Sequence, residues 1–498
     1  MSRIEQDDIQ GLLRSGFGGL RSASYLMLRV ADVREAKNWL AQVREQVTTY
    51  ADLDKHVNTA LQVGFTAAGL RALGLSDRIV VEFAPEFVSG MTGDETRTRQ
   101  LGDIGRNAPE NWAWGYKDRE PHVVVMLFAA PGELYQLQQS ITTPSFDAGF
   151  NILADVPTAN LDDEEPFGFV DGISQPKLDW KGERTPGTDA DLEYGNLIAL
   201  GEFILGYMNE YGRYTRRPLL DAAEDRTSVL PPADGASDRR DLGRNGAYLV
   251  FRQLEQDVTG FWRFAAKDRS FAEAEKLASA MVGRKRNGEP LAAVGTRAIL
   301  GVEPDPPNRP RNSFTYDADK KAVTCPYGAH IRRSNPRNGD MPGGRQGLLS
   351  QWLRQLGLKK GDPRDDVIAS SRFHRVLRRG REYGAPPTPE QALDASAFDP
   401  GSGLNFICVN ANISRQFEFI QSAWVMSSKF DGMTGETDPL LGNREKLATG
   451  DATDKFVQPQ DAGPCSVIEG VPQFVTVKGG AYFFLPSVRA IRFLAALE

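Results

Sequence analysis

Apolar runs rich in β-branched and aromatic residues recur along the chain, and helical spacing follows most of them. Such runs occupy residues 24–30, 122–129, 247–252, 404–413 and 473–487. Short runs of this composition predict strands, whereas apolar residues spaced by three and four predict helices. The two patterns together predict an α+β protein built in two halves. The last run carries Gly479 and Gly480 near its centre, which predicts a hairpin turn at that point.

A polar stretch rich in Arg, Asp and Pro separates the two halves. It spans residues 213–246 and has the composition of an exposed connection. We therefore expect an N-terminal domain over residues 1–212, this connecting stretch, and a C-terminal domain over residues 247–498. A chain of 498 residues is long enough for two large domains or for three of about 150 residues each.

Composition excludes two classes of partner. The chain has 59 Lys and Arg residues against 66 Asp and Glu, a net charge of −7. This balance argues against a dedicated nucleic-acid binder, because binding to phosphates requires a basic surface. No stretch of the sequence approaches the ~20 apolar residues of a membrane span. We therefore expect neither nucleic acid nor a membrane as a partner.

Cysteine usage and the N-terminal residues predict a cytoplasmic protein. The three cysteines, Cys325, Cys408 and Cys465, are an odd number that fits reduced thiols better than a disulfide framework. The N-terminal residues carry acids and no apolar core, so they do not resemble a secretory signal. The sequence has no CxxC motif, which excludes a Cys-rich zinc site and a covalently attached c-type haem.

Histidine is scarce, and this limits the metal chemistry of the chain. Only His56, His122, His330 and His374 occur, with no HExxH motif and no closely spaced pair. A metal site built from several histidines is therefore excluded. The motifs GxxxxGK[ST], GxGxxG and GxSxG are also absent, which argues against the common nucleotide-binding and serine-hydrolase functions.

Asp171 is the first residue suited to chemistry. It lies within residues 165–176 (EPFGFVDGISQP), between glycines and apolar residues. One interpretation is a simple turn at Asp171 and Gly172. The other is a carboxylate held in a partly apolar loop, where desolvation raises its pKa and suits it to proton transfer.

His330 is the second candidate, within residues 324–337 (TCPYGAHIRRSNPR). An isolated histidine is often a structural residue with its hydrogen bonds satisfied. One imidazole cannot hold zinc alone, but it can be the sole protein ligand of haem iron, because the porphyrin supplies four further nitrogens.

The third segment is basic. Residues 372–381 (RFHRVLRRGR) contain five arginines among ten residues. They form either a solvated basic surface or a nucleic-acid contact, and the net charge weakens the second option. Arginine also suits the binding of carboxylates and the stabilisation of developing negative charge.

These three segments, in this order, carry a resemblance to the dye-decolorizing peroxidase family, most of all to its longer forms. GFVDG (168–172) matches the GxxDG signature of that family, CPYGAHIRRSNPR (325–337) its haem-ligand segment, and LRRGREYG (377–384) its distal-arginine segment. Further matching segments occur at residues 8–11, 201–207, 248–258, 281–284 and 405–424. The resemblance covers nearly the whole chain.

The resemblance implies a role for each candidate. His330 matches the proximal ligand of haem b, Asp171 the distal acid and base, and Arg378 the distal arginine. It further implies two ferredoxin-like domains with antiparallel sheets, in an arrangement like a dimeric α/β barrel, with the haem between sheet and helices.

Three more residues follow from the resemblance. Arg337 matches an arginine that binds a haem propionate, and Leu404 and Phe406 match an apolar pair that narrows the distal pocket. Residues two apart on a strand share a face, so Leu404 and Phe406 are expected to point the same way.

Two assignments remain open at the level of sequence. The family commonly has Pro where this chain has Glu382, and the Arg-Arg pair makes the register ambiguous, so Arg379 is the alternative to Arg378. His374 is the rival ligand. On a helix His374 and Arg378 would share one face, whereas a proximal ligand and a distal arginine must lie on opposite sides of the haem, which favours His330.

The implied activity is that of a haem peroxidase, which reduces hydrogen peroxide and oxidises dyes, phenolics and other one-electron donors. The alternatives are a deferrochelatase-like or haem-handling protein and, in another class, a haem-free binding module that uses the arginine cluster. An acid paired with an arginine favours the peroxidase, since carriage of haem requires neither. An oligomer is compatible with this activity.

Aromatic residues offer two further interpretations. Trp112, Trp114 and Tyr116 cluster in sequence, and Tyr383 lies close to Arg378. They either pack in the core or relay electrons from bulky donors at the surface.

Overall fold

The computed structural model describes residues 4–186, 194–294, 299–303, 305, 311–339, 352, 356, 370–446 and 449–497. Its centre is one nine-stranded sheet whose pairings are all antiparallel, in the order β11-β13-β10-β16-β2-β3-β1-β4, with β12 also paired to β13. The strands are β1 (Ser22–Val30), β2 (Thr59–Phe65), β3 (Val123–Ala129), β4 (Phe150–Pro157), β10 (Ala247–Gln256), β11 (Leu377–Arg378), β12 (Arg381–Tyr383), β13 (Ser402–Asn410) and β16 (Val475–Leu485).

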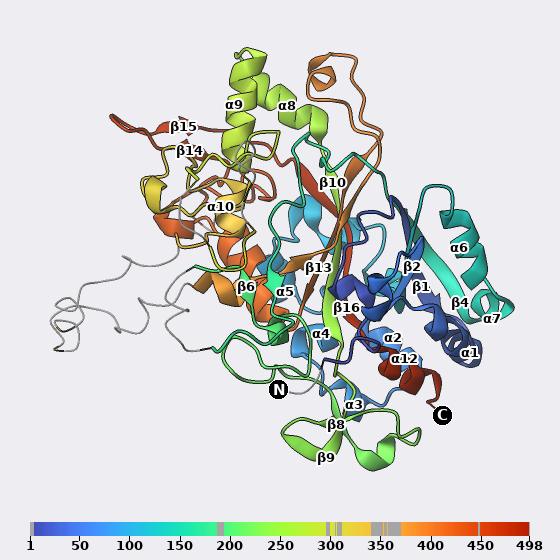
Figure 1. Ribbon diagram of the computed structural model, residues 1–498. Coiled ribbons are helices and arrows are strands. Elements are labelled where there is room, and N and C mark those ends of the chain that lie inside the picture. Colours follow the sequence, from blue (N-terminus) through green and yellow to red (C-terminus); the bar gives the residue numbers. More distant parts are fainter. Residues whose placement is uncertain are drawn as a thin grey trace.

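Helices pack around this sheet. They are α1 (Val33–Val43), α2 (Ala67–Ala72), α3 (Asp77–Val80), α4 (Pro85–Ser89), α5 (Glu95–Leu101), α6 (Leu134–Ile141), α7 (Pro144–Gly149), α8 (Val258–Ala266), α9 (Phe271–Val282), α10 (His330–Ser334) and α12 (Val488–Ala495). Figure 1 shows α1, α6 and α7 beside β1 and β4 at one edge of the sheet, whereas α8 and α9 lie at the top of the view, beyond the upper end of β10. The predicted α+β class with antiparallel strands is confirmed.

The two halves of the chain share the sheet. Strands β1 to β4 belong to the first half, β10 to β13 and β16 belong to the second, and Phe484 of β16 pairs with Phe65 of β2 where they meet. Residues 213–246 form a small antiparallel sheet of β7 (Leu219–Asp221), β8 (Pro232–Ala233) and β9 (Ala236–Asp241). The domain boundaries drawn from the sequence stay a prediction.

Two small two-stranded sheets complete the description. Parallel β5 (Lys177–Leu178) and β6 (Leu197–Ile198) form one pair, and antiparallel β14 (Phe456–Gln458) and β15 (Ser466–Ile468) form another. Within the described ranges, every helix falls short of the length and apolarity that a membrane crossing needs.

The inner strand β3 is buried on both faces, which explains its continuous apolar sequence. On β3, Val123, Val125 and Leu127 enter one hydrophobic cluster, whereas Val124, Met126 and Phe128 enter a second. Side chains alternate between the two faces of a strand, so a strand buried on both faces has no polar positions in its sequence.

The predicted hairpin at Gly479 and Gly480 is wrong, because both residues lie inside the continuous strand β16. The register against β10 shifts there, with Gly479 opposite Gln253 and Val477 opposite Leu254, which leaves Lys478 as the extra residue of a bulge. A Cβ on Gly479 would lie 2.5 Å from the indole of Trp114. The glycine serves close packing rather than a turn.

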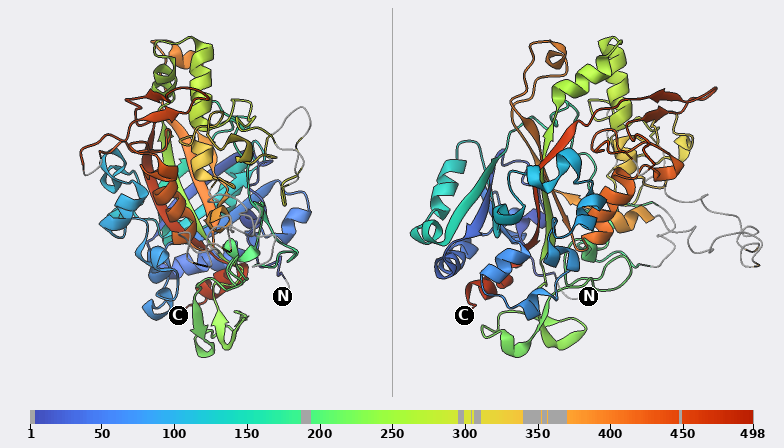
Figure 2. Two further views of the ribbon diagram at one scale, coloured as in Figure 1. Left: turned by 90° about the vertical axis from the view of Figure 1, so that its left-hand side faces the viewer. Right: turned by 180° about the vertical axis from the view of Figure 1, so that it is seen from behind.

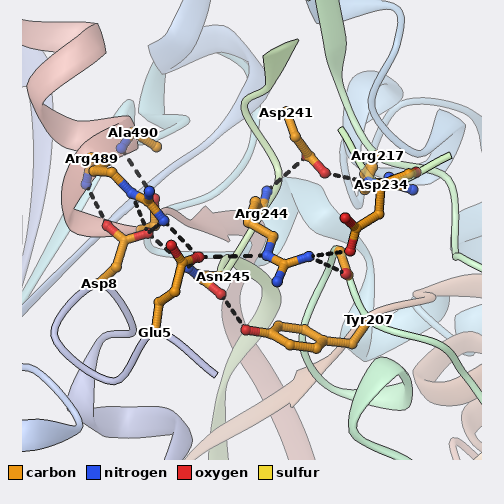
Figure 3. A network of polar contacts seen from close by, with 12 residues as sticks. Glu5, Asp8, Tyr207, Arg217, Asp234, Asp241, Arg244, Asn245, Arg489 and Ala490 are labelled. Carbon is orange, nitrogen blue, oxygen red and sulfur yellow. Dashed lines mark hydrogen bonds and ion pairs between the residues drawn. The ribbon is translucent and has the colours of Figure 1, made fainter. Parts of the chain in front are cut away.

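A polar network joins the two ends of the chain, which lie at the same end of the molecule in Figures 1 and 2. Figure 3 shows the carboxylate of Asp8 accepting hydrogen bonds from the backbone N–H and Nε of Arg489 at 2.8 and 2.9 Å and from Asn245 Nδ2 at 2.8 Å. Glu5 forms an ion pair with Arg489 at 2.7 Å. These contacts fasten the N-terminal segment to the start of α12.

Replacing Asp8 by Ala is expected to lower the free energy of unfolding by about 2–3 kcal/mol, because the buried Asn245 amide and the Arg489 backbone N–H each lose a charged acceptor. Denaturant unfolding of the variant measures this. Asp7→Ala, which removes an exposed carboxylate one residue away, is the control and should change stability by less than about 0.5 kcal/mol. Equal stability of the two variants would contradict the fastening role.

Candidate active site

A cavity of about 290 Å³ lies between the main sheet and the helices that cover it. Its sheet side includes Leu254 of β10, Leu404 and Phe406 of β13, and Val475 and Val477 of β16. Its remaining wall includes residues of α10, of the irregular helices at 414–418 and 420–425, and of the loop before β5. The predicted residues Asp171, His330, Arg337, Arg378, Leu404 and Phe406 all line this cavity.

Asp171 and Arg378 form an ion pair within the cavity. Arg378 Nη1 donates to Asp171 Oδ1 at 2.9 Å, and about a third of each side chain stays exposed, 31% for Asp171 and 32% for Arg378. The backbone N–H of Arg378 donates to Gln175 Oε1 at 3.0 Å, and its Nη2 donates to the carbonyl of Ser174 at 3.3 Å. The loop that carries Asp171 thus also positions the arginine.

The electrostatics of Asp171 differ from the sequence expectation. Burial acts to raise its pKa, as expected, but the charge and the hydrogen bond of Arg378 outweigh burial, and the pKa lies below the ordinary value. The carboxylate is therefore ionised at neutral pH and can accept a proton.

The structure distinguishes the two adjacent arginines. Arg378 lies on β11, paired with Cys408 of β13, and lines the cavity. Arg379 instead donates through Nε to the carbonyl of Leu12 at 2.7 Å and has no place in the cavity lining. Neighbouring residues on an extended segment point to opposite sides, so only one of the two reaches the cavity.

His330 is held by a carboxylate that the sequence reasoning missed. His330 begins α10, and its Nδ1 lies 2.9 Å from Oδ2 of the buried Asp438. The other oxygen of Asp438 accepts the backbone N–H groups of Leu440 and Leu441, both at 2.9 Å. An Nδ1–H that donates to this carboxylate leaves Nε2 as the free acceptor. Because 108 residues separate the pair, no local motif could reveal it.

Two opposing effects act on the pKa of His330. Burial acts to lower its pKa, but the charge and the hydrogen bond of Asp438 outweigh burial, and the pKa lies above the ordinary value. The pairing therefore makes the imidazole a stronger base, which is the property of a good metal ligand.

The rival histidine has different surroundings. His374 stacks on Phe419, with ring centroids 3.7 Å apart, and meets Trp424 edge-on. Its Nδ1 lies 2.5 Å from the carbonyl oxygen of Arg415. Both histidines line the cavity, but of the two only His330 pairs with a carboxylate among the described residues.

The cavity also has a basic end. Arg284, Arg337 and Arg375 line it, and none of the three forms an ion pair with a carboxylate in the described part of the chain. Arg337 is 2% exposed and donates to the carbonyl of Phe314 at 2.6 Å. Burial and the nearby charge of Arg337 lower the pKa of Arg284 to about 10. Cations gathered in this way favour a ligand that carries carboxylates.

One further titratable group lies in the cavity. Glu165 accepts hydrogen bonds from Gln256 Nε2 at 2.8 Å and from the backbone N–H groups of Phe167 and Phe169. Burial raises its pKa to about 7. The sequence reasoning included Glu165 in the Asp171 segment but gave it no role.

Comparison with known proteins finds similar chains and one matching domain family. A family model described as the DyP dimeric alpha+beta barrel domain matches residues 8–151. Multifunctional dye peroxidase DyP2 of Amycolatopsis sp. is 28% identical, over 94% of this chain and 91% of its own length. Dye-decolorizing peroxidase msp1 of Mycetinis scorodonius is also 28% identical, over 87% of this chain and 76% of its own.

Solved structures share the fold. A fungal DyP-type peroxidase from Auricularia auricula-judae matches with a TM-score of 0.71 and 24% identity, over 100% of both chains. An ancestral D-type dye decolorizing peroxidase matches with a TM-score of 0.70 and 23% identity, over 99% of each chain. The chain is thus similar in sequence to dye-decolorizing peroxidases over most of its length, and it shares the fold of the solved DyP-type peroxidases.

Proposed function

We propose that the protein is a haem peroxidase that reduces hydrogen peroxide and oxidises dyes, phenolics and other one-electron donors. The observation that carries the proposal is one cavity that contains both a carboxylate-held histidine, His330, and an ionised acid paired with an arginine, Asp171 and Arg378. Relatives over most of the chain are named dye peroxidases, and one structural neighbour is a dye-decolorizing peroxidase in complex with 2,6-dimethoxyphenol.

The residues present fit haem b. Its flat apolar ring matches the aliphatic and aromatic lining of the cavity, and its two propionates match the cations Arg284, Arg337 and Arg375. His330 would ligate the iron through Nε2, with Asp438 holding the other ring nitrogen. Leu404 and Phe406 would narrow the space beside Asp171.

When bound, haem supplies the redox-active iron that peroxide oxidises and that organic donors reduce again. Asp171 accepts the proton of the inner peroxide oxygen through its carboxylate and passes it to the outer oxygen, which then leaves as water. Arg378 stabilises the negative charge that develops as the O–O bond breaks. Its bond to Asp171 also keeps the carboxylate ionised between turnovers.

The same pair argues against the alternatives. A deferrochelatase-like or haem-handling protein requires neither an ionised acid nor an arginine beside it, and a haem-free module requires no cavity lined by His330. The cytoplasmic location, an oligomeric state and the absence of nucleic-acid and membrane partners stay predictions from the sequence.

Visible absorption of the purified protein, loaded with haem, tests the proposal. We expect a haem spectrum that changes within seconds of adding hydrogen peroxide and returns when a phenol is supplied. A haem spectrum that does not change with peroxide would favour the haem-handling protein. A protein that binds no haem would favour the haem-free binding module.

Arg378 is expected to set the acid limit of activity. Without the charge of Arg378, nothing offsets the burial of Asp171, so the pKa of that carboxyl rises. As the pH falls, Asp171 is then protonated at a higher pH than in the wild type and no longer acts as the base. The acid limb of kcat/KM for peroxide should therefore move to higher pH in Arg378→Leu. In Arg378→Lys, which keeps the charge, the limb should move less. Identical limbs in the wild type and Arg378→Leu would contradict this coupling.

Asp438→Asn is expected to weaken haem binding by about 10–100-fold, because the ring of His330 loses its carboxylate partner. Titration of the haem-free protein with haem measures the affinity. Asp431→Asn, at an exposed position nearby in sequence, is the control. An unchanged affinity in Asp438→Asn would show that Asp438 does not position the ligand.

A further inference from the structure

The proposed reaction needs protons that Asp171 does not supply. One hydrogen peroxide takes up two electrons and two protons to give two waters. Asp171 returns to the outer oxygen the proton that it removes from the inner one, so the first water uses both protons of the peroxide. The inner oxygen therefore needs two further protons to become water. Asp171 is ionised and bound to Arg378, so it has no proton of its own to give.

A second acid, Glu165, lies on the sheet side of the same cavity. It accepts a hydrogen bond at 2.8 Å from Gln256 Nε2. Gln256 lies two residues after Leu254 on β10, so the two side chains share a face of the strand. Leu254 pairs with Leu404 of β13. All four residues line the cavity together with Asp171, so Glu165 faces the space in which Asp171 acts.

A short loop fixes the position of Glu165 relative to Asp171. The backbone N–H groups of Phe167 and Phe169 donate to the carboxylate of Glu165 at 3.1 and 3.2 Å. The backbone N–H of Glu165 in turn donates to the carbonyl of Phe169 at 2.9 Å. Asp171 follows directly after this loop, and its charge acts on Glu165. The two acids are therefore held near each other by the same few residues.

The surroundings of Glu165 favour its protonated form. Burial raises its pKa to about 7, and the charge of Asp171 acts in the same direction. The charged groups of the neighbouring elements are Arg252 of β10, Arg284 and Arg286 after α9, Arg378 of β11 and Glu382 of β12. In the described part of the chain none of the arginines pairs with Glu165, and Arg252, Arg286 and Arg378 each pair with another carboxylate. Glu165 can therefore hold a proton near neutral pH, where Asp171 cannot.

Gln256 provides a link between this acid and the cavity. The residue is 7% exposed. Its Nε2 binds Glu165, whereas its Oε1 is buried and has no protein donor among the residues that the structure describes. A buried amide oxygen without a protein donor commonly binds water. Because Gln256 lines the cavity, water bound to this oxygen would connect the carboxyl group of Glu165 with the interior of the cavity.

We propose that Glu165 supplies protons to the inner peroxide oxygen through water bound to Gln256. This inference rests on the proposed peroxidase function. In each turnover two donor molecules each lose one electron. Twice the carboxyl O–H bond of Glu165 breaks, a new O–H bond forms on the inner oxygen, and Glu165 recovers a proton from the solvent. The inner oxygen then leaves as the second water. Asp171 thus transfers the protons of the peroxide itself, and Glu165 transfers those that come from the solvent.

Infrared spectroscopy of the full-length protein loaded with haem follows the proton on Glu165 without turnover. The C=O band of a protonated carboxyl group is separate from the bands of carboxylates. We expect the wild type to lose one such band as the pH rises through the pKa of Glu165, about 7, and Glu165→Gln to lack this change. In Gln256→Leu the carboxylate loses a hydrogen bond that lowers its pKa, so the band should persist to higher pH. Glu164→Gln, at the exposed carboxylate next to Glu165, is the matched control and should titrate as the wild type does.

Reduction of the peroxide-treated protein gives a second readout. Ferrocyanide gives an electron without a proton, whereas a phenol brings a proton with its electron. Stopped-flow absorption measures the rate with each donor after one equivalent of peroxide. In Glu165→Gln the ratio of the ferrocyanide rate to the phenol rate should fall about 10²-fold. In the wild type this ratio should fall as the pH rises and Glu165 ionises, and in Gln256→Leu the fall should move to higher pH. Glu164→Gln should keep the wild-type ratio.

The outcomes separate proton supply from a structural role and from the peroxidase function. A lower donor ratio in Glu165→Gln, with the infrared change absent, supports the proposal. A ratio that matches the wild type in Glu165→Gln would overturn it, and a general loss of stability or an equal slowing with both donors would then show that Glu165 only holds the loop. A pH dependence that is the same in Gln256→Leu and the wild type would also overturn it. A wild type that binds haem but does not react with peroxide would overturn the peroxidase function itself.

Discussion

Asp171→Asn is expected to bind haem as the wild type does and to react with hydrogen peroxide about 10²–10⁴-fold more slowly, because the amide cannot accept the peroxide proton. Stopped-flow absorption after mixing with peroxide measures the rate directly. Asp162→Asn, at an exposed carboxylate of the same loop region, is the matched control and should react at the wild-type rate.

Arg378→Leu tests the other member of the pair. It should also retain haem, and the loss of a cation where negative charge develops should slow the peroxide reaction by about 10²–10³-fold. If Asp171→Asn keeps the wild-type rate while Arg378→Leu is slow, the arginine is the main catalyst and the proposed division of labour is wrong. If both variants are slow, the acid and the arginine act together.

His330→Ala is expected to bind haem more weakly by a larger factor than the ~10–100-fold predicted for loss of its partner Asp438, and the absorption spectrum of any haem retained should change. The reason is that the iron loses its only protein ligand. His56→Ala, at an exposed histidine, is the control and should keep both the affinity and the spectrum of the wild type. An unchanged spectrum in His330→Ala would transfer the ligand role to His374.

Much of the fold could be predicted from the sequence, because a strand that is buried on both faces is apolar at nearly every position. The apolar run at residues 122–129 predicted a strand, and β3 (Val123–Ala129) occupies it. The glycines at 479 and 480 misled the prediction because glycine serves both turns and close packing. Only the position of Trp114, which lies against Gly479, decides between them, and Trp114 is remote in sequence.

The site was predictable one residue at a time, but not as an arrangement. Asp171, His330 and Arg378 each lie in a recognisable segment, and all three line one cavity. The lowered pKa of Asp171 was not predictable, because it depends on an ion pair between residues 207 positions apart. Asp438 carried no local signal, since a carboxylate becomes a histidine partner only where the fold brings the two together.

The choice between Arg378 and Arg379 also could not be made from the local sequence. The sequence leaves the register of the Arg-Arg pair open, because either residue could face inward on a short strand. The pairing of Arg378 with Cys408 and the contacts of Arg379 with the N-terminal segment settle which guanidinium reaches the cavity. Both contacts come from residues distant in the chain.

A crystal structure of the protein grown with an excess of haem tests the central claim most directly. The account predicts porphyrin in the cavity, iron bound to Nε2 of His330, propionates against Arg284, Arg337 and Arg375, and the Asp171 and Arg378 pair facing the open side of the metal. An empty cavity, iron on His374, or Asp171 and Arg378 on the same side of the ring as His330 would contradict it.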